Sequence, residues 1–109
     1  MPNPLAINTV MRTLADPTRR AVFERIVNAS EITVVELTRG SGVTQSAISQ
    51  HLRSLKQAGL IVDRPEGRNV HYRAEPKGLA PLVDWMRHYD VFWQDRFTGL
   101  RALLKEIDP

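Results

Sequence analysis

The spacing of apolar residues predicts two helices at the start of the chain. Apolar side chains recur at intervals of three and four over residues 5–14, which places them on one face of a helix. A second helix is predicted in ADPTRRAVFERIVNAS, where Asp16 can cap the free amides and Pro17 can take the first helical position. Its apolar stripe consists of Ala21, Val22, Ile26 and Ala29.

The next stretch, EITVVELTRGSG, carries two conflicting signals. Its four β-branched residues at 32–35 favour a strand. The apolar residues up to Leu37 nevertheless lead into Gly40 and Gly42 in the way that a short helix ends. We predict a short third helix here.

Residues 43–61, VTQSAISQHLRSLKQAGLI, predict a helix with one apolar and one polar side. Thr44 is placed to cap its start and Gly59 to end it. At about 100° per residue, Leu52 and Leu55 fall within about 40° of Ile48. The opposite side carries Ser46, Gln50, Arg53 and Gln57, with Ser49 beside them and Gln45 near the helix start. This polar side has no acidic residue.

After the predicted helix, the spacing of apolar residues changes from helical spacing to alternation. Residues 70–74 alternate apolar and polar side chains, and residues 65–69 supply turn residues between two short extended runs. This pattern predicts a β-hairpin. Three arginines lie on or near it: Arg64, Arg68 and Arg73.

The last segment, residues 77–107, predicts one long amphipathic helix in which Pro81 is tolerated only in the first turn. Its apolar residues recur at helical spacing: Leu82, Met86, Tyr89, Trp93, Leu100, Leu103, Leu104 and Ile107. The chain shows no repeat or linker. We therefore expect residues 1–109 to form a single, mainly α-helical domain with a small β-hairpin.

Charge is distributed unevenly along the chain. Residues 1–78 carry 11 Lys/Arg and 7 Asp/Glu, whereas residues 79–109 carry 4 and 5. Residues 37–62 contain Arg39, Arg53 and Lys56 but no acidic residue, so this segment is the face expected to meet a polyanion. Arginine outnumbers lysine 12 to 3, and planar guanidinium groups suit phosphates and guanine edges.

Several classes of protein are disfavoured by what the sequence lacks. Without cysteine there are no thiolate nucleophiles and no thiolate metal sites. No apolar run is long enough to span a membrane and the N-terminal residues do not form a secretion signal, so we expect a cytoplasmic protein without a membrane partner. Ser49 and His51 diverge by about 200° on a helix and cannot form a nucleophile–base pair. We expect neither an enzyme nor a bound cofactor.

A short helix, a glycine-containing turn and a second helix with a polar side form the pattern of a helix-turn-helix, and the following hairpin makes it a winged one. The major groove of DNA admits one helix between walls of phosphate, which would repel a carboxylate. Glutamine and serine can hydrogen-bond base edges, and arginine can bind guanine or phosphate. Double-stranded DNA is therefore the predicted partner.

Three stretches, LADPTRRAVFERIV, VTQSAISQHLRSLKQAGLI and GRNVHYRAE, resemble the ArsR-type winged-helix repressors of bacteria over nearly the whole chain. This resemblance implies a homodimeric repressor, joined through its first and last helices, that reads the half-sites of a pseudo-palindromic operator. It implies base contacts from Gln45, Ser46, Ser49 and Gln50. It also implies phosphate or minor-groove contacts from Arg53, Arg64 and Arg68, and for His51 either packing or a phosphate contact.

The sequence departs from that family where metal sensing would be encoded. Metal sensors of this type carry a cysteine pair before the turn or an Asp-x-His motif with a second histidine, and neither pattern is present. Asp84 and His88 share a helix face, but two ligands are too few for zinc. The sequence thus resembles a branch without recognised metal ligands, and its effector is not identified.

The aromatic residues of the C-terminal segment occupy more of the helix circumference than packing on one domain requires. We favour a subunit interface over an effector pocket. The residues expected in the interface are Leu5, Met11, Trp85, Tyr89, Phe92, Trp93, Phe97 and Leu100. Two alternatives remain open: a winged-helix module that binds a protein partner through these aromatic residues, and a repressor that responds to a ligand or metal at an unrecognised sensor site.

Overall fold

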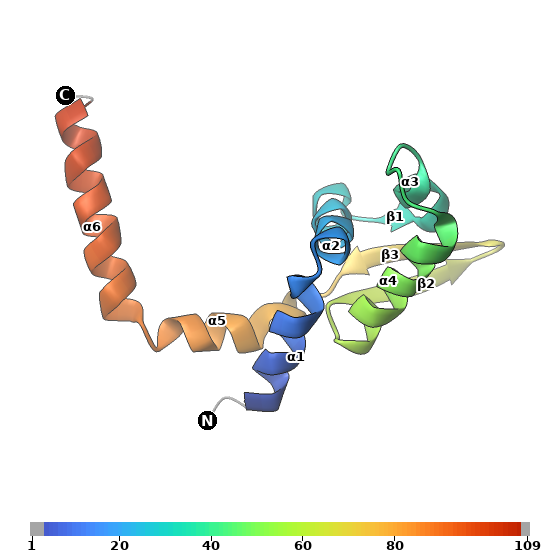
Figure 1. The fold of residues 1–109 in the computed structure, drawn as a ribbon, viewed down its shortest axis with the longest axis horizontal. Helices are drawn as coiled ribbons and strands as arrows, with labels where there is room; N and C mark the ends of the chain where they lie inside the picture. The colour runs from blue at the N-terminus through green and yellow to red at the C-terminus, as the bar shows by residue number, and fades with distance from the viewer. Residues whose placement is uncertain (1–3, 108–109) are drawn as a thin grey trace.

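The chain folds into a helical body that carries a three-stranded sheet, with a C-terminal helix that extends away from it (Figure 1). The computed structural model describes residues 4–107, apart from the side chains at positions 4, 93, 95, 97, 106 and 107. The elements are α1 (Pro4–Ala15), α2 (Pro17–Ala29), β1 (Ile32–Thr33), α3 (Val34–Thr38), α4 (Gln45–Gln57), β2 (Ile61–Glu66), β3 (Asn69–Ala74), the 3-10 turn η1 (Pro76–Leu79), α5 (Ala80–Arg87) and α6 (Asp90–Ile107). The predicted mainly α fold, its first four helices and its hairpin are confirmed.

The predicted helix ends follow from local hydrogen bonds. The Asp16 carboxylate accepts the Arg19 N–H at 3.0 Å and caps α2. The Thr44 hydroxyl accepts the Ala47 N–H at 3.1 Å and caps α4. Gly59 ends α4 with a φ of +77°, a conformation that glycine adopts without strain.

The buried core lies between α2, α4 and the sheet. Its members are Val10, Val22, Phe23, Ile26, Ile32, Leu37, Ile48, Leu52, Leu55, Leu60 and Ile61. Burial of each large apolar side chain contributes about 1.5–3 kcal/mol relative to exposure. The predicted apolar side of α4 is thereby fixed against the body, and its polar side faces solvent.

The sheet has the strand order β1-β3-β2, and both strand pairs are antiparallel. The two-residue strand β1 was not predicted, although its β-branched residues gave the signal for a strand. The turn predicted over residues 65–69 is too long. Positions 65, 66 and 69 belong to the strands, and Gly67, with a φ of +61°, begins a two-residue loop of the kind that matches strand twist.

The single helix predicted over residues 77–107 is wrong. The turn η1 and α5 cover residues 76–87, and α6 begins anew at Asp90. The N–H groups of His88 and Tyr89 bond back to the carbonyls of Trp85 and Met86, which closes α5. The apolar spacing does not reveal this break because it continues in α6, while Asp90 is favoured at the start of a helix.

The C-terminal part is joined to the body through η1 and α5. Helix α5 packs on α1. At Gly78, an added Cβ atom would lie 2.3 Å from the carbonyl oxygen of Gly59, so only glycine lets η1 lie against the end of α4. Among residues 4–107, no helix combines the length and apolar character needed to cross a membrane.

Candidate nucleic-acid interface

Helices α3 and α4, with the turn between them, form the predicted helix-turn-helix. Gly40 and Gly42 in the turn have φ values of +71° and +74°. Between them, the Ser41 hydroxyl donates to the Thr38 carbonyl at 2.8 Å and accepts the Val43 N–H at 3.0 Å. The two glycines therefore allow the backbone conformation of the turn, and the hydrogen bonds of Ser41 stabilise it.

The short helix α3 is held at both ends. At its start, Thr33 and Glu36 form a capping box, in which each side chain bonds the backbone of the other residue. At its end, the Arg25 guanidinium of α2 donates to the carbonyls of Leu37 and Glu36, both at 2.7 Å. These contacts fix the direction in which the chain enters α4.

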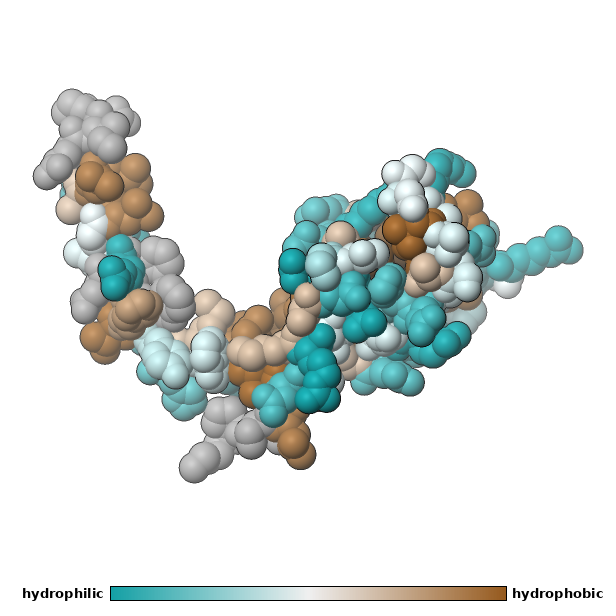
Figure 2. Space-filling model, in the orientation of Figure 1, coloured by the Kyte–Doolittle hydropathy of each residue, from teal (hydrophilic) through white to brown (hydrophobic). Residues whose placement is uncertain are grey.

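The polar side of α4 gathers the predicted base-reading residues. Gln45, Ser46 and Gln50 are exposed, as is Arg53, and Ser49 is half-buried. The surface over α4 in Figure 2 is mainly hydrophilic. The structure thus places these five side chains on the solvent-facing side of one helix, in a stretch of the chain without carboxylates.

His51 lies differently from the other predicted DNA contacts. Its side chain is half-buried, and its Nδ1 atom is buried without a hydrogen-bond partner. The Arg19 N–H lowers the pKa of Asp16, and electrostatic interactions with His51 and Arg19 lower it further. Helix α4 packs on α2, and a phosphate contact from His51 stays a prediction.

A salt bridge joins α4 to the wing, which we define as β2, β3 and their loop. Lys56 Nζ lies 2.9 Å from Asp63 Oδ2. This hydrogen bond raises the pKa of Lys56. Ser49, Arg53 and Tyr72 line the groove beside the bridge, so the wing is held next to the polar side of α4.

The wing arginines lie in different surroundings. Arg68 is exposed in the loop at the wing tip, which projects from the body (Figure 1). Arg64 is bonded to Glu31 and to Glu66, and these hydrogen bonds raise the pKa of Arg64. Arg68 is thus presented to solvent, whereas Arg64 is held by two carboxylates.

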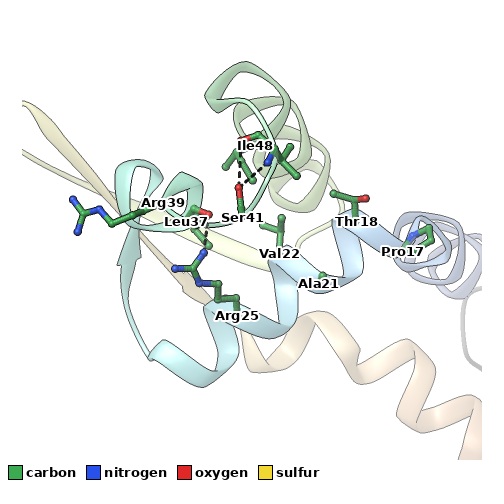
Figure 3. A pocket seen from close by; sticks show the side chains of 11 residues that line it. Pro17, Thr18, Ala21, Val22, Arg25, Leu37, Arg39, Ser41 and Ile48 are labelled. Carbon is green, nitrogen blue, oxygen red and sulfur yellow. Dashed lines mark hydrogen bonds between the residues drawn. The ribbon is translucent and has the colours of Figure 1, made fainter.

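A cleft of about 600 Å³ lies between α2 and the turn that leads into α4. Its wall includes the apolar side chains of Val22 and Ile48. Figure 3 shows Arg25 directed toward Leu37, with its hydrogen bond drawn, and Arg39 directed away from the cleft. The cleft has room for a small molecule, and the charged residues that line it are arginines.

Large apolar side chains are exposed on α1, α5 and α6. The exposed fraction is 72% for Leu5 and 49% for Leu100, and Figure 2 shows apolar groups along α6 and where α1 meets α5. Other exposed members of the predicted interface are Met11, Trp85, Tyr89 and Phe92. The side chains of Trp93 and Phe97 lie outside the described residues.

Two structural contacts were missed by sequence reasoning. Arg25 and Glu31 were not singled out, because each reaches a partner more than ten positions away. The spacing of apolar and polar residues along the chain does not indicate contacts between such distant positions. Among the described residues, no group of three or more His, Asp or Glu side chains is placed to hold a metal ion.

Comparison with known proteins agrees with this geometry. A family model described as "Helix-turn-helix domain" matches residues 14–64. The HTH-type transcriptional regulator Rv2034 of Mycobacterium tuberculosis is 42% identical over 85% of this chain and 83% of its own length. The arsenical resistance operon repressor of Escherichia coli is 36% identical over 90% of this chain and 81% of its own length.

A solved structure gives the same result. The crystal structure of an ArsR family transcriptional regulator matches 84% of this chain and 94% of that chain, with a TM-score of 0.72 and 27% identity. The winged helix-turn-helix, the polar side of α4 and these relatives agree. The protein belongs to the ArsR family of DNA-binding transcriptional regulators, which are not enzymes.

Proposed function

We propose that the protein is a homodimeric repressor that occupies a pseudo-palindromic operator. The polar side of α4 carries this proposal, because it offers amide and hydroxyl groups in a stretch without carboxylates. In the major groove, Gln45, Ser46, Ser49 and Gln50 read base edges, since their side chains can both donate and accept hydrogen bonds. By occupying a promoter in the cytoplasm, the dimer blocks transcription.

The cations around α4 position the protein on the DNA backbone. Arg53 on α4 and Arg68 at the wing tip are both exposed and contact phosphates. His51 adds a contact only if its half-buried ring turns outward. Arg64 is already bonded to Glu31 and Glu66, so a phosphate contact from Arg64 would require the loss of these bonds.

The apolar surface of α1, α5 and α6 supports the dimer. A helix that exposes Leu100, Leu103 and Leu104 at about half of their surface needs a partner to cover them. The aromatic residues of the same region, including Trp93 and Phe97 by their positions on α6, belong to this interface. Pairing of two copies also gives the two-fold symmetry that a palindromic operator requires.

The sequence lacks the side chains that a thiolate sensor uses to bind its effector. Some relatives are named for arsenic resistance, but this chain contains no cysteine. A soft ion such as arsenite is bound by thiolates, so this sequence provides no such ligands. The function proposed here is therefore operator binding, without an assigned inducer.

Fluorescence anisotropy tests the proposal directly. The purified protein is titrated against duplex DNA from upstream of its own gene and against a shuffled duplex, at several salt concentrations. We expect binding to the upstream DNA to be tighter by about 1,000-fold or more, with two chains per site. A parallel selection from random duplexes should enrich a pseudo-palindrome. Equal binding to all sequences and no enriched sequence would overturn the proposal.

A further inference from the structure

Three side chains on the wing and one from the loop before β1 form a cluster that we call the wing clamp: Arg64, Glu66 and His71 on the wing, and Glu31. Arg64 Nη2 bonds Glu31 Oε1, and Arg64 Nη1 donates to Glu66 Oε2 at 2.9 Å. His71 lies between the same two carboxylates, with Nδ1 3.4 Å from Glu31 and Nε2 3.4 Å from Glu66. Both ends of the guanidinium therefore have acidic partners.

The strand register explains why these residues meet. Arg64 is paired with His71 across β2 and β3, and Glu66 lies two residues further along the same face of β2. His71 is also paired with Thr33 of β1, and Glu31 lies two residues before Thr33. The opposite face of the sheet carries Asp63, whose partner is Lys56 of α4. The clamp thus occupies the face turned away from α4.

The charge of the clamp opposes DNA binding. Around Arg64, two carboxylates surround one guanidinium, so these three side chains together carry a net negative charge. A DNA phosphate would have to displace carboxylates that already bond both terminal nitrogens of Arg64. The Arg64 side chain is nevertheless 54% exposed, so a phosphate can reach it once the carboxylates are removed.

We propose that Glu31 and Glu66 set the DNA affinity of the protein by holding Arg64 away from the DNA backbone. The wing then contacts the DNA only through the loop at positions 67–68. This inference depends on the proposed function in one respect, which is that the wing lies beside the bound DNA duplex. It predicts that Arg64 becomes a phosphate contact when both carboxylates are neutralised.

The test measures the salt dependence of binding to a duplex of random sequence. Four proteins are compared by fluorescence anisotropy: the wild type, Arg64→Gln, Glu31→Gln/Glu66→Gln, and the triple variant that adds Arg64→Gln to this pair. For the double variant, we expect the plot of log K against log salt to be steeper by about 0.9 per bound chain, because one more phosphate is neutralised. The triple variant should have the slope of Arg64→Gln.

A matched control removes two carboxylates elsewhere. Glu24→Gln/Asp84→Asn makes the same change in net charge on α2 and α5, and its slope should equal that of the wild type. Circular dichroism checks folding, and Glu31→Ala/Glu66→Ala, which also removes both carboxylates, replaces the double variant if the latter is unfolded. Equal steepening in the double and triple variants would overturn the inference, as would an unchanged slope. Because no operator is used, this result is independent of whether the upstream DNA is preferred.

Discussion

The guanidinium of Arg25 in α2 donates a hydrogen bond of 2.7 Å to the carbonyl oxygen of Leu37, next to the end of α3. A second bond of 2.7 Å reaches the carbonyl of Glu36. The last carbonyls of a helix have no partner within the helix, so an outside donor stabilises them. The first helix of the helix-turn-helix is therefore fixed by the helix that precedes it.

Replacement of Arg25 by methionine should destabilise the fold. The variant keeps much of the side-chain length but loses both hydrogen bonds, which we expect to lower the free energy of unfolding by about 1–2 kcal/mol. Urea denaturation measures this change. Arg68→Met, at the exposed wing tip, is the control and should change stability by less than about 0.5 kcal/mol. Equal effects of the two substitutions would contradict the role of Arg25.

Gln50 and Arg68 should affect DNA binding in different ways. Gln50→Ala should remove about 1–3 kcal/mol of discrimination at one operator position, because a base-edge hydrogen bond is lost. Arg68→Ala should weaken binding to every sequence and reduce the salt slope by about 0.9 per bound chain. Anisotropy titrations against operators with single base changes separate the two. A loss that is the same on all sequences for Gln50→Ala would refute base reading.

Leu100→Asp should disrupt the proposed dimer. A carboxylate placed in the apolar surface of α6 would lose its hydration on pairing, so it favours the monomer. Sedimentation equilibrium reports the mass of the species in solution. Thr98→Asp places the same charge at an exposed polar position of α6 and serves as the control. A Leu100→Asp protein that stays dimeric would move the interface away from this part of the helix.

Asp16 should make stability depend on pH in acid. Its folded-state pKa is lowered below the ordinary value of 3.8, chiefly by the hydrogen bond from the Arg19 N–H. The ionised group therefore stabilises the fold above pH 3.8, and this contribution is lost as the pH falls through the lowered pKa. Asp16→Asn should flatten the pH dependence of unfolding below about pH 4. Denaturation at several acidic pH values measures it, and an unchanged profile would argue against this assignment.

Gly78→Ala should strain the contact between η1 and the end of α4. The new Cβ atom would overlap backbone atoms that cannot move independently, and we expect a cost of about 1–3 kcal/mol. Gly99→Ala is the matched control, because a Cβ atom there meets nothing within 4 Å and alanine favours the helix. The midpoint temperature of thermal unfolding should fall for Gly78→Ala and should not fall for Gly99→Ala.

The sequence predicted the parts of the fold that depend on local pattern. The caps at Asp16 and Thr44, the end of α4 at Gly59 and the buried side of α4 each follow from the properties of a few neighbouring residues. The resemblance to the ArsR family was found in the same stretches of sequence. These signals are strong because capping, φ preference and helical spacing act within one or two turns.

Two of the features that sequence reasoning missed depend on contacts between distant segments. Glu31 meets Arg64 only because the sheet register brings the loop before β1 beside β2. The requirement for glycine at position 78 arises from the approach of the backbone at Gly59. The break between α5 and α6 was missed for another reason, since both helices continue the same apolar spacing. Side-chain pattern indicates which residues share a face but not whether the backbone is continuous.

The break at His88 and Tyr89 has a consequence for the length of DNA that the proposed dimer can read. If α6 joins the two copies, the bend sets the distance between the two α4 helices. Two such helices read the same side of B-DNA when they lie about 34–36 Å apart, one turn of the duplex, or a multiple of that distance. One residue inserted into a helix rotates the rest of that helix by about 100°. In a dimer joined through α6, we therefore expect a residue inserted between His88 and Tyr89 to change the half-site spacing that the protein accepts.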